Sequence, residues 1–237
     1  MNRFIIFDYS PEIANQFSGE NLIPRVSHSE DINYAYDDCR KNNSVHCVWL
    51  DAPLMSLSDM DFSGINGEIP IVAHVYCIGD TFRVISEIDN LKRISIRIFL
   101  SSTFSENFSH IKLLSSLGID SAILFDSARI DDDAFLDLAS YALLGQVPHA
   151  SIEPFDYIWR NLQDDKNLDF STLYFENPYR YIYVNNNLDF AFTDKDLKSG
   201  KFVGNMSEIN EVSFDVEVKE KLSSYYDHFM NLDECSK

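Results

Sequence analysis

The chain has 237 residues, 45% of them hydrophobic, which allows one large globular domain or one medium domain with an appendage. Its 38 acidic and 19 basic residues give a net charge of −19, so its field repels phosphate backbones and anionic membrane surfaces. The apolar run near the N-terminus is too short for a signal peptide, and no window approaches the roughly 18 apolar residues of a membrane span. We therefore expect a cytoplasmic protein whose partners include neither nucleic acid nor a membrane.

The four cysteines lie far apart in the sequence, at Cys39, Cys47, Cys77 and Cys235. They are too few and too scattered for the disulfide framework of a secreted domain, so reduced thiols are expected. They also lack the close Cys-x-x-Cys spacing that zinc knuckles and iron–sulfur clusters use.

From about Val45 to Glu153, short apolar runs alternate with segments of helical periodicity. The helical segments include 80–93 and 105–118, and Gly118 occupies the position of a helix C-cap glycine. The runs between them, which we predict to be strands, end at Asp51, Cys77, Ser102, Asp126 and Phe155.

Near-continuous apolar strands, each followed by a helix, are typical of a parallel sheet covered by helices. A repeat near 25 residues, with no glycine-rich phosphate loop after the first strand, favours a barrel over a nucleotide-binding open sheet. The predicted fold class is therefore α/β, with a partial (β/α) TIM-like barrel over residues 1–165. Residues 166–237 are predicted to form a small appendage. In it, a hairpin within residues 179–194 turns at the Asn-rich segment 185–187, and a helix follows over residues 216–232.

Four passages in this order carry a resemblance to a known family. They are "LLSSLGIDSAILF", "IEPFDYI", "YIYVNNNLDFAFTD" followed by "GKFVGN", and the late helix that runs into Cys235. The order resembles the radical S-adenosylmethionine (SAM) proteins with a C-terminal SPASM domain, especially the cluster-less pseudo-members associated with peptide maturation. The resemblance implies a partial barrel followed by a SPASM-like appendage, which is apparently truncated here.

Two departures from the family pattern concern cofactors. The catalytic cluster of the family needs the spacing Cys-x-x-x-Cys-x-x-Cys, which the sequence lacks, so radical chemistry is not expected. In the SPASM-like region the resemblance implies further cysteines, and Cys235 stands there alone as a candidate remnant ligand. We therefore expect no cofactor, and an iron–sulfur cluster only if the chain is a truncated version of a longer protein.

Ligands of parallel barrels meet the carboxyl ends of the strands, where variable loops are held by a rigid sheet. Converging carboxylates there suit a basic peptide segment or a divalent cation, whereas isolated ones are typical helix caps and loop acids. The residues predicted at these ends are Asp51, Tyr76, Ser101, Asp126 and Glu153.

A second set, His46, Cys47, His74 and Cys77, would suit zinc if all four converged. Strand alternation points His74 and Cys77 to opposite faces, so we expect packing roles and no metal.

The function expected from these features is that of a non-catalytic accessory or scaffold protein, which binds a precursor peptide or a partner maturase. Dense Tyr and Phe between Phe170 and Phe192 suit contact with a peptide or protein, although they equally suit packing of the hairpin on the barrel. Two alternatives stay open: an enzyme with an acidic site at the barrel mouth, with or without a metal ion, and a truncated iron–sulfur peptide maturase.

Overall fold

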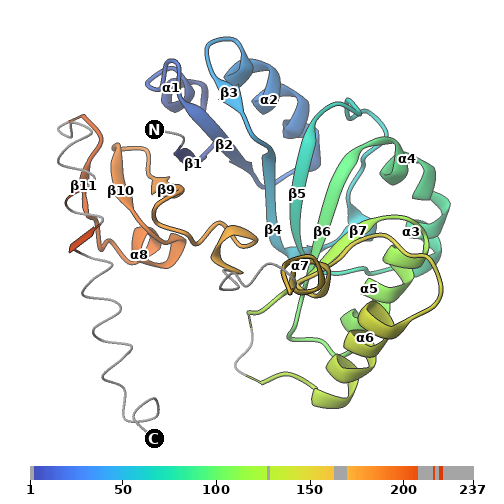
Figure 1. Ribbon diagram of the computed structural model, residues 1–237. Coiled ribbons are helices and arrows are strands. Elements are labelled where there is room, and N and C mark those ends of the chain that lie inside the picture. Colours follow the sequence, from blue (N-terminus) through green and yellow to red (C-terminus); the bar gives the residue numbers. More distant parts are fainter. Residues whose placement is uncertain (1–2, 127–128, 163–169, 208–215, 217–218, 221–237) are drawn as a thin grey trace, which may run out of the picture.

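The computed structural model describes residues 3–126, 129–162, 170–207, 216 and 219–220 (Figure 1). The strands are β1 (Phe4–Asp8), β2 (Asn21–Val26), β3 (Ser44–Val45), β4 (Val48–Ser56), β5 (Pro70–Cys77), β6 (Ser95–Ser101), β7 (Asp120–Leu124), β8 (Ile152–Glu153), β9 (Tyr181–Val184), β10 (Asp189–Ala191) and β11 (Gly204–Asn205). The α-helices are α1 (Pro11–Ala14), α2 (Ile32–Arg40), α3 (Thr81–Ser86), α4 (Ile88–Arg93), α5 (Glu106–Ser116), α6 (Asp132–Leu144), α7 (Phe155–Asn161) and α8 (Asp194–Lys198).

One large sheet organises the chain, in the order β11-β10-β9-β1-β2-β4-β5-β6-β7-β8, with β3 beside β2. All neighbouring strands from β9 to β8 pair in parallel. From β1 to β8 the strands adjoin one another in chain order, and the intervening helices α2 to α6 lie along the outside of the sheet (Figure 1). The α/β class and the parallel strands predicted between Val45 and Glu153 are thus confirmed.

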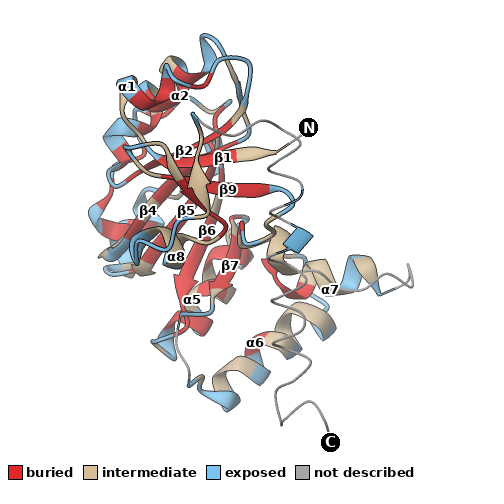
Figure 2. Cartoon of the chain, turned by 90° about the vertical axis from the view of Figure 1, so that its left-hand side faces the viewer, coloured by how far each residue is buried: buried red, intermediate tan, exposed pale blue. Residues whose placement is uncertain are grey.

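Alternation along each strand divides the side chains between two faces of the sheet. In β4, Val48 and Leu50 join the core that packs against the helices, whereas Trp49 and the preceding Cys47 join a smaller core on the opposite, inner face. Figure 2 shows that buried residues follow the strands, while α6 is buried only in part. Burying a side chain such as Leu50, which is 0% exposed, contributes about 1.5–3 kcal/mol.

The helix ends follow local sequence signals. Helix α5 ends at Gly118, whose φ of +88° is a left-handed conformation that glycine adopts without a Cβ penalty. The backbone N–H of Gly118 donates to Ser115 O at 3.0 Å, and that of Ile119 donates to Leu114 O at 3.0 Å. These two bonds form a Schellman C-cap, as the position of Gly118 predicts.

The structure also contains two strands that the sequence analysis did not predict. Strands β1 and β2 precede Val45 and pair in parallel near the centre of the sheet. The apolar run in β1 is short, and β2 contains Pro24, which lacks a backbone donor and usually argues against a central strand. Burial between neighbouring strands overrides both local signals.

The hairpin predicted within residues 179–194 is present, because β9 and β10 pair antiparallel. Strand β9 also pairs in parallel with β1, so the hairpin extends the main sheet rather than forming a sheet of its own. The sheet therefore runs across the domain boundary predicted at residue 165. The helix predicted over 216–232 lies, except for residues 216, 219 and 220, outside the described residues, and so does Cys235.

Residues 172–176 lie against the inner face and are tied to it by aromatic side chains. The Phe175 ring packs on Trp49 at a centroid distance of 5.5 Å. The Tyr183 hydroxyl donates to Phe175 O at 3.2 Å, and the Tyr174 hydroxyl donates to Ile123 O at 3.0 Å. Phe175, Tyr181 and Tyr183 thus pack on the inner face, whereas Phe190 and Phe192 pack on the opposite face of the sheet with Phe7 and Phe17. No helix in the described part of the chain has the length and apolarity needed to cross a membrane.

Candidate functional site

A buried arginine lies near the carboxyl end of β2, on the inner face of the sheet. The Arg25 side chain is 6% exposed, and its Nε donates to Asp8 Oδ1 at 2.6 Å. Its Nη1 donates to Asp194 Oδ1 at 2.5 Å and lies 3.7 Å from Asp51 Oδ2. We refer to Asp8, Arg25, Asp51 and Asp194 as the Arg25 cluster.

Four elements position these side chains. Asp8, the last residue of β1, lies opposite Arg25 in the parallel register, and Arg25 lies opposite Trp49 in β4. Asp51 follows Trp49 by two residues and therefore faces the same side of the sheet. Asp194 begins α8, which Thr193 caps by accepting a hydrogen bond from the Asp196 N–H.

The electrostatics of the cluster combine burial with close pairing. Burial alone would lower the pKa of Arg25, but hydrogen bonds to Asp8 and Asp194 and the charges of both raise it above the ordinary value. Burial acts to raise the pKa of Asp194, yet Lys198 and Arg25 bring it below the ordinary value. Burial raises the pKa of Asp51 and outweighs the opposing effect of Arg25. Three carboxylates thus face two cations, because Lys198 Nζ also pairs with Asp194 at 2.6 Å.

Two buried nitrogen atoms beside the cluster have no hydrogen-bond partner among the described residues. They are Trp49 Nε1 and His74 Nε2. The Trp49 ring lies under the Arg25 guanidinium at 5.4 Å, and His74 packs between Trp49 and Phe99 at 4.9 and 4.8 Å. Burial, assisted by the charge of Arg25, lowers the pKa of His74 to about 3, so this imidazole is neutral at physiological pH.

Of the five residues predicted at the strand ends, Tyr76, Ser101 and Asp126 serve neighbouring loops. Asn107 Nδ2 donates to the carbonyl oxygens of both Tyr76 and Ser101 at 2.8 Å, which joins the ends of β5 and β6. The carboxylate of Asp126 accepts hydrogen bonds from the Ser102 N–H at 3.0 Å and from its hydroxyl at 3.1 Å. Asp126 thus makes its contacts with neighbouring loop residues, whereas Tyr76 and Ser101 make these contacts with their main-chain carbonyl groups.

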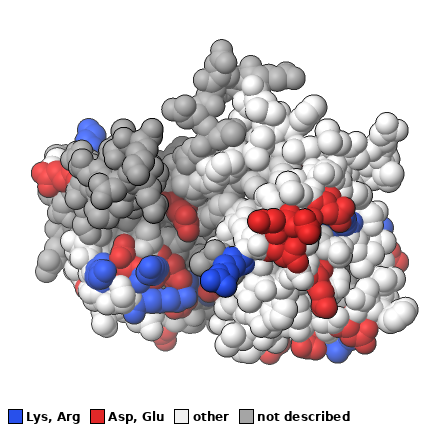
Figure 3. All heavy atoms as spheres, turned by 90° about the horizontal axis from the view of Figure 1, so that it is seen from below, with Lys and Arg blue, Asp and Glu red and all other residues white. Residues whose placement is uncertain are grey.

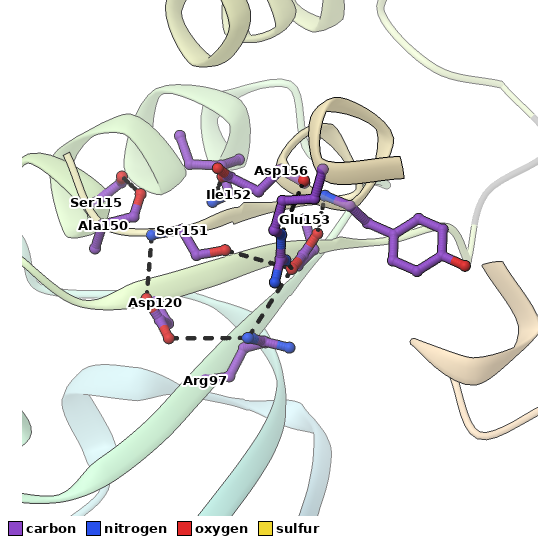
Figure 4. Close-up of polar contacts among 10 residues, drawn as sticks. Arg97, Ser115, Asp120, Ala150, Ser151, Ile152, Glu153 and Asp156 are labelled. Atoms are coloured by element: carbon purple, nitrogen blue, oxygen red, sulfur yellow. Dashed lines mark hydrogen bonds and ion pairs between the residues drawn. The ribbon is translucent and has the colours of Figure 1, made fainter. Parts of the chain in front are cut away.

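The fourth predicted residue, Glu153, is completely buried in a polar network (Figure 4). Its carboxylate accepts hydrogen bonds from Arg160 Nη2 at 2.5 Å and from the Tyr157 N–H at 2.8 Å. Ser151 Oγ donates to it at 3.3 Å, and Arg97 Nη2 lies 4.0 Å away. These contacts compensate the buried charge and fasten α7 to the edge of the sheet.

The predicted carboxylates form separate groups. Asp51, the fifth predicted residue, and Glu153 lie in one register row that runs through His74, Phe99 and Ala122. They are four strands apart, which is about 19 Å along the sheet at the usual strand spacing. A single substrate atom or metal ion therefore does not meet both.

The proposed zinc ligands are also separated. Val48 lies opposite Ile71 in the register, which places Cys47 four residues before His74, or about 13 Å along the strands. His46 packs on Phe4 at 4.5 Å, and Cys77 Sγ lies 3.3 Å from Ser56 Oγ. In the described part of the chain, no three His, Cys, Asp or Glu side chains are grouped so as to hold a metal ion.

Three members of the Arg25 cluster, Asp8, Arg25 and Asp194, were missed by the sequence analysis. A usable signal is present, because a lone Arg25 interrupts the apolar run of β2, and Asp8 directly follows the apolar run of β1. Asp194 gave no signal beyond its place after a capping threonine. Its contact with Arg25 spans 169 residues and depends on the tertiary fold.

Charge on one end of the molecule is mixed rather than uniformly acidic. Figure 3 shows Lys and Arg side chains gathered beside acidic ones on one side of this view, and a patch of Asp and Glu on the other. Comparisons of the chain with protein-family models, curated proteins and solved structures gave no significant match.

Proposed function

We propose that the protein is a non-catalytic binding protein, whose sheet is an open barrel of the radical SAM type and which holds a precursor peptide or partner maturase. The observation that carries the proposal is the Arg25 cluster, where an excess of carboxylates meets at the carboxyl ends of β1 and β2, beside Asp51 in β4. The side chain of Asp8 is 71% exposed, so one carboxylate of the cluster is accessible to a partner. A positively charged segment of a peptide is the ligand that this charge favours.

The winding of the sheet supports the barrel part of the proposal. Strands that adjoin one another in chain order, with helices along one face, are arranged as in a barrel rather than as in a doubly wound sheet. In the described residues the sheet is open, with β8 at one edge and β11 at the other. A SPASM-like role for β9, β10 and β11 is part of the same proposal.

The proposal that the chain has no radical chemistry rests on its cysteines. The chain lacks the Cys-x-x-x-Cys-x-x-Cys spacing, and Cys39 and Cys47 are buried, with pKa values that burial raises to about 12. Binding without catalysis is the role that these residues support.

The test uses the two tryptophans of the chain. The Trp49 ring lies against the Arg25 guanidinium, and Trp159 is 60% exposed, so the Trp159→Phe variant isolates the fluorescence of Trp49. We expect hexalysine, as the cationic probe, to change this fluorescence with a Kd in the micromolar range, and hexaglutamate to leave it unchanged.

A matched pair of variants separates the cluster from the general negative field. Asp8→Asn removes an exposed carboxylate of the cluster, and Asp37→Asn removes an exposed one on α2. Asp8→Asn should weaken hexalysine binding about tenfold, and Asp37→Asn less than twofold. Equal effects of both variants would mean that the peptide follows the net charge alone, and the proposed site would be abandoned.

A further inference from the structure

A second feature of the inner face lies at the opposite ends of the strands. A cavity of about 560 Å³ adjoins Pro70, Ser95 and Asp120, which are the first residues of β5, β6 and β7. Its other wall is formed by Thr172, Leu173 and Phe175, and by Arg180 and Tyr181, where β9 begins. The volume falls within the range of small-molecule sites, about 300–1,000 Å³.

The charged lining of this cavity is opposite in sign to the net charge of the chain. It contains Lys92, Arg97 and Arg180, but only one carboxylate, Asp120. Lys92 and Arg180 are exposed, and neither has a carboxylate within ion-pair distance in the described part of the chain. A chain with twice as many acidic as basic residues thus gathers cations around one hollow.

Arg97 is the cation that lies deepest in the wall. Its Nη2 is 3.8 Å from Asp120 and 4.0 Å from Glu153, distances of ion pairs that are too long for hydrogen bonds (Figure 4). Its Nε is buried and has no acceptor among the described residues. A buried guanidinium donor without an acceptor is costly, and an anionic ligand would satisfy it.

The remaining wall of the cavity is largely apolar. It includes Val72, Phe99, Leu173 and Phe175. Such a wall favours a ligand with an apolar body over a free inorganic ion, because binding then removes apolar surface from water.

We infer that this cavity binds a small organic anion, whose carboxylate or phosphate group accepts hydrogen bonds from Arg97 and whose apolar body packs against Phe99 and Phe175. Arg180 and Lys92 lie at the exposed rim of the cavity, where their positive charges attract the anionic group of the ligand. The site is independent of the Arg25 cluster, which lies at the carboxyl ends of the strands. It takes an anion, whereas the Arg25 cluster suits a cation.

Isothermal titration calorimetry on the full chain tests this inference with four probes. Benzoate and phenyl phosphate carry both an anionic group and an apolar body, whereas benzyl alcohol lacks the charge and inorganic phosphate lacks the body. We expect benzoate or phenyl phosphate to bind at least tenfold more tightly than the other two probes. The tighter of the two identifies the acidic group as carboxylate or phosphate.

Variants then locate the binding. Arg97→Gln should weaken the tighter probe at least tenfold, and Arg180→Gln about threefold, while Arg83→Gln, an exposed arginine on α3, should leave it unchanged. Arg180 is exposed, so its variant tests the site even if Arg97→Gln fails to fold. The inference would be overturned if neither aromatic anion bound with a Kd below about 10 mM. It would also be overturned if the Arg180→Gln and Arg83→Gln variants bound the tighter probe with equal affinity.

Discussion

Replacing Arg25 by methionine tests how much the Arg25 cluster contributes to stability. The substitution keeps most of the apolar stem of the side chain but removes the guanidinium and its hydrogen bonds to Asp8 and Asp194. Hydrogen bonds to charged groups contribute about 1.5–3 kcal/mol each. The bond to Asp8 belongs at or below the lower limit, because that carboxylate is 71% exposed and screened by water.

The bond to Asp194, which is 27% exposed, lies within the range, so the expected total loss is roughly 3 kcal/mol. For a chain of this length, a loss of 3 kcal/mol lowers the melting temperature by about 6–12 °C. Thermal unfolding followed by circular dichroism at pH 7 measures it. Arg40→Met is the control, because Arg40 is exposed on α2 and its guanidinium lies over the Tyr36 ring.

The effect should also depend on pH, with a sign set by Asp194. The pKa of Asp194 in the folded chain lies below its ordinary value of 3.8, so the carboxylate stabilises the fold above that pH. This contribution is lost as the pH falls through the folded pKa. The difference between the wild-type chain and Arg25→Met should therefore be full at pH 7 and smaller below about pH 4. A melting temperature within about 2 °C of wild type at pH 7, or an equal loss at pH 7 and pH 3, would refute the reasoning.

Three other predictions concern the core, a helix end and a buried imidazole. Leu50→Ala, at a fully buried position, should lower the free energy of unfolding by about 2–5 kcal/mol, whereas Leu54→Ala, at a position 90% exposed, should change it by less than about 0.5 kcal/mol in the same urea titration. Gly118→Ala should lower the free energy of unfolding by about 1–2 kcal/mol, because φ is +88° at this residue. Gly64→Ala is the control and should lower it less, because φ is not positive there and no atom lies within 4 Å of an added Cβ. Similar losses in the two variants would argue against the C-cap at Gly118. Burial lowers the pKa of His74 to about 3, so the folded state favours the neutral imidazole, and stability should fall as the pH drops from about 6.5 towards 3. Melting temperatures measured across this pH range should therefore depend less on pH in His74→Phe than in the wild-type chain.

Local sequence signals are sufficient to predict the α/β class and most of the parallel sheet. The apolar runs that become β4, β5, β6 and β7 are continuous because both faces of those strands are buried, and the helices between them carry their own stop signals, such as Gly118. Asp131, which caps α6 by accepting a hydrogen bond from the Ala134 N–H, is equally local. Signals of this kind act within one or two turns of chain, so they can be read from the sequence alone.

The candidate sites were decided by the tertiary structure. Arg25 meets Asp194 across 169 residues because β9 adds to the sheet beside β1 and brings α8 back to the carboxyl end of β2. The cavity at the opposite end exists because residues 172–181 lie against the inner face beside Arg97. Conversely, Asp51 and Glu153, which look alike in sequence, are held four strands apart by the strand order. Local sequence fixes each strand, but the distance between two side chains depends on which strands pair, and that is settled by burial summed over the whole sheet.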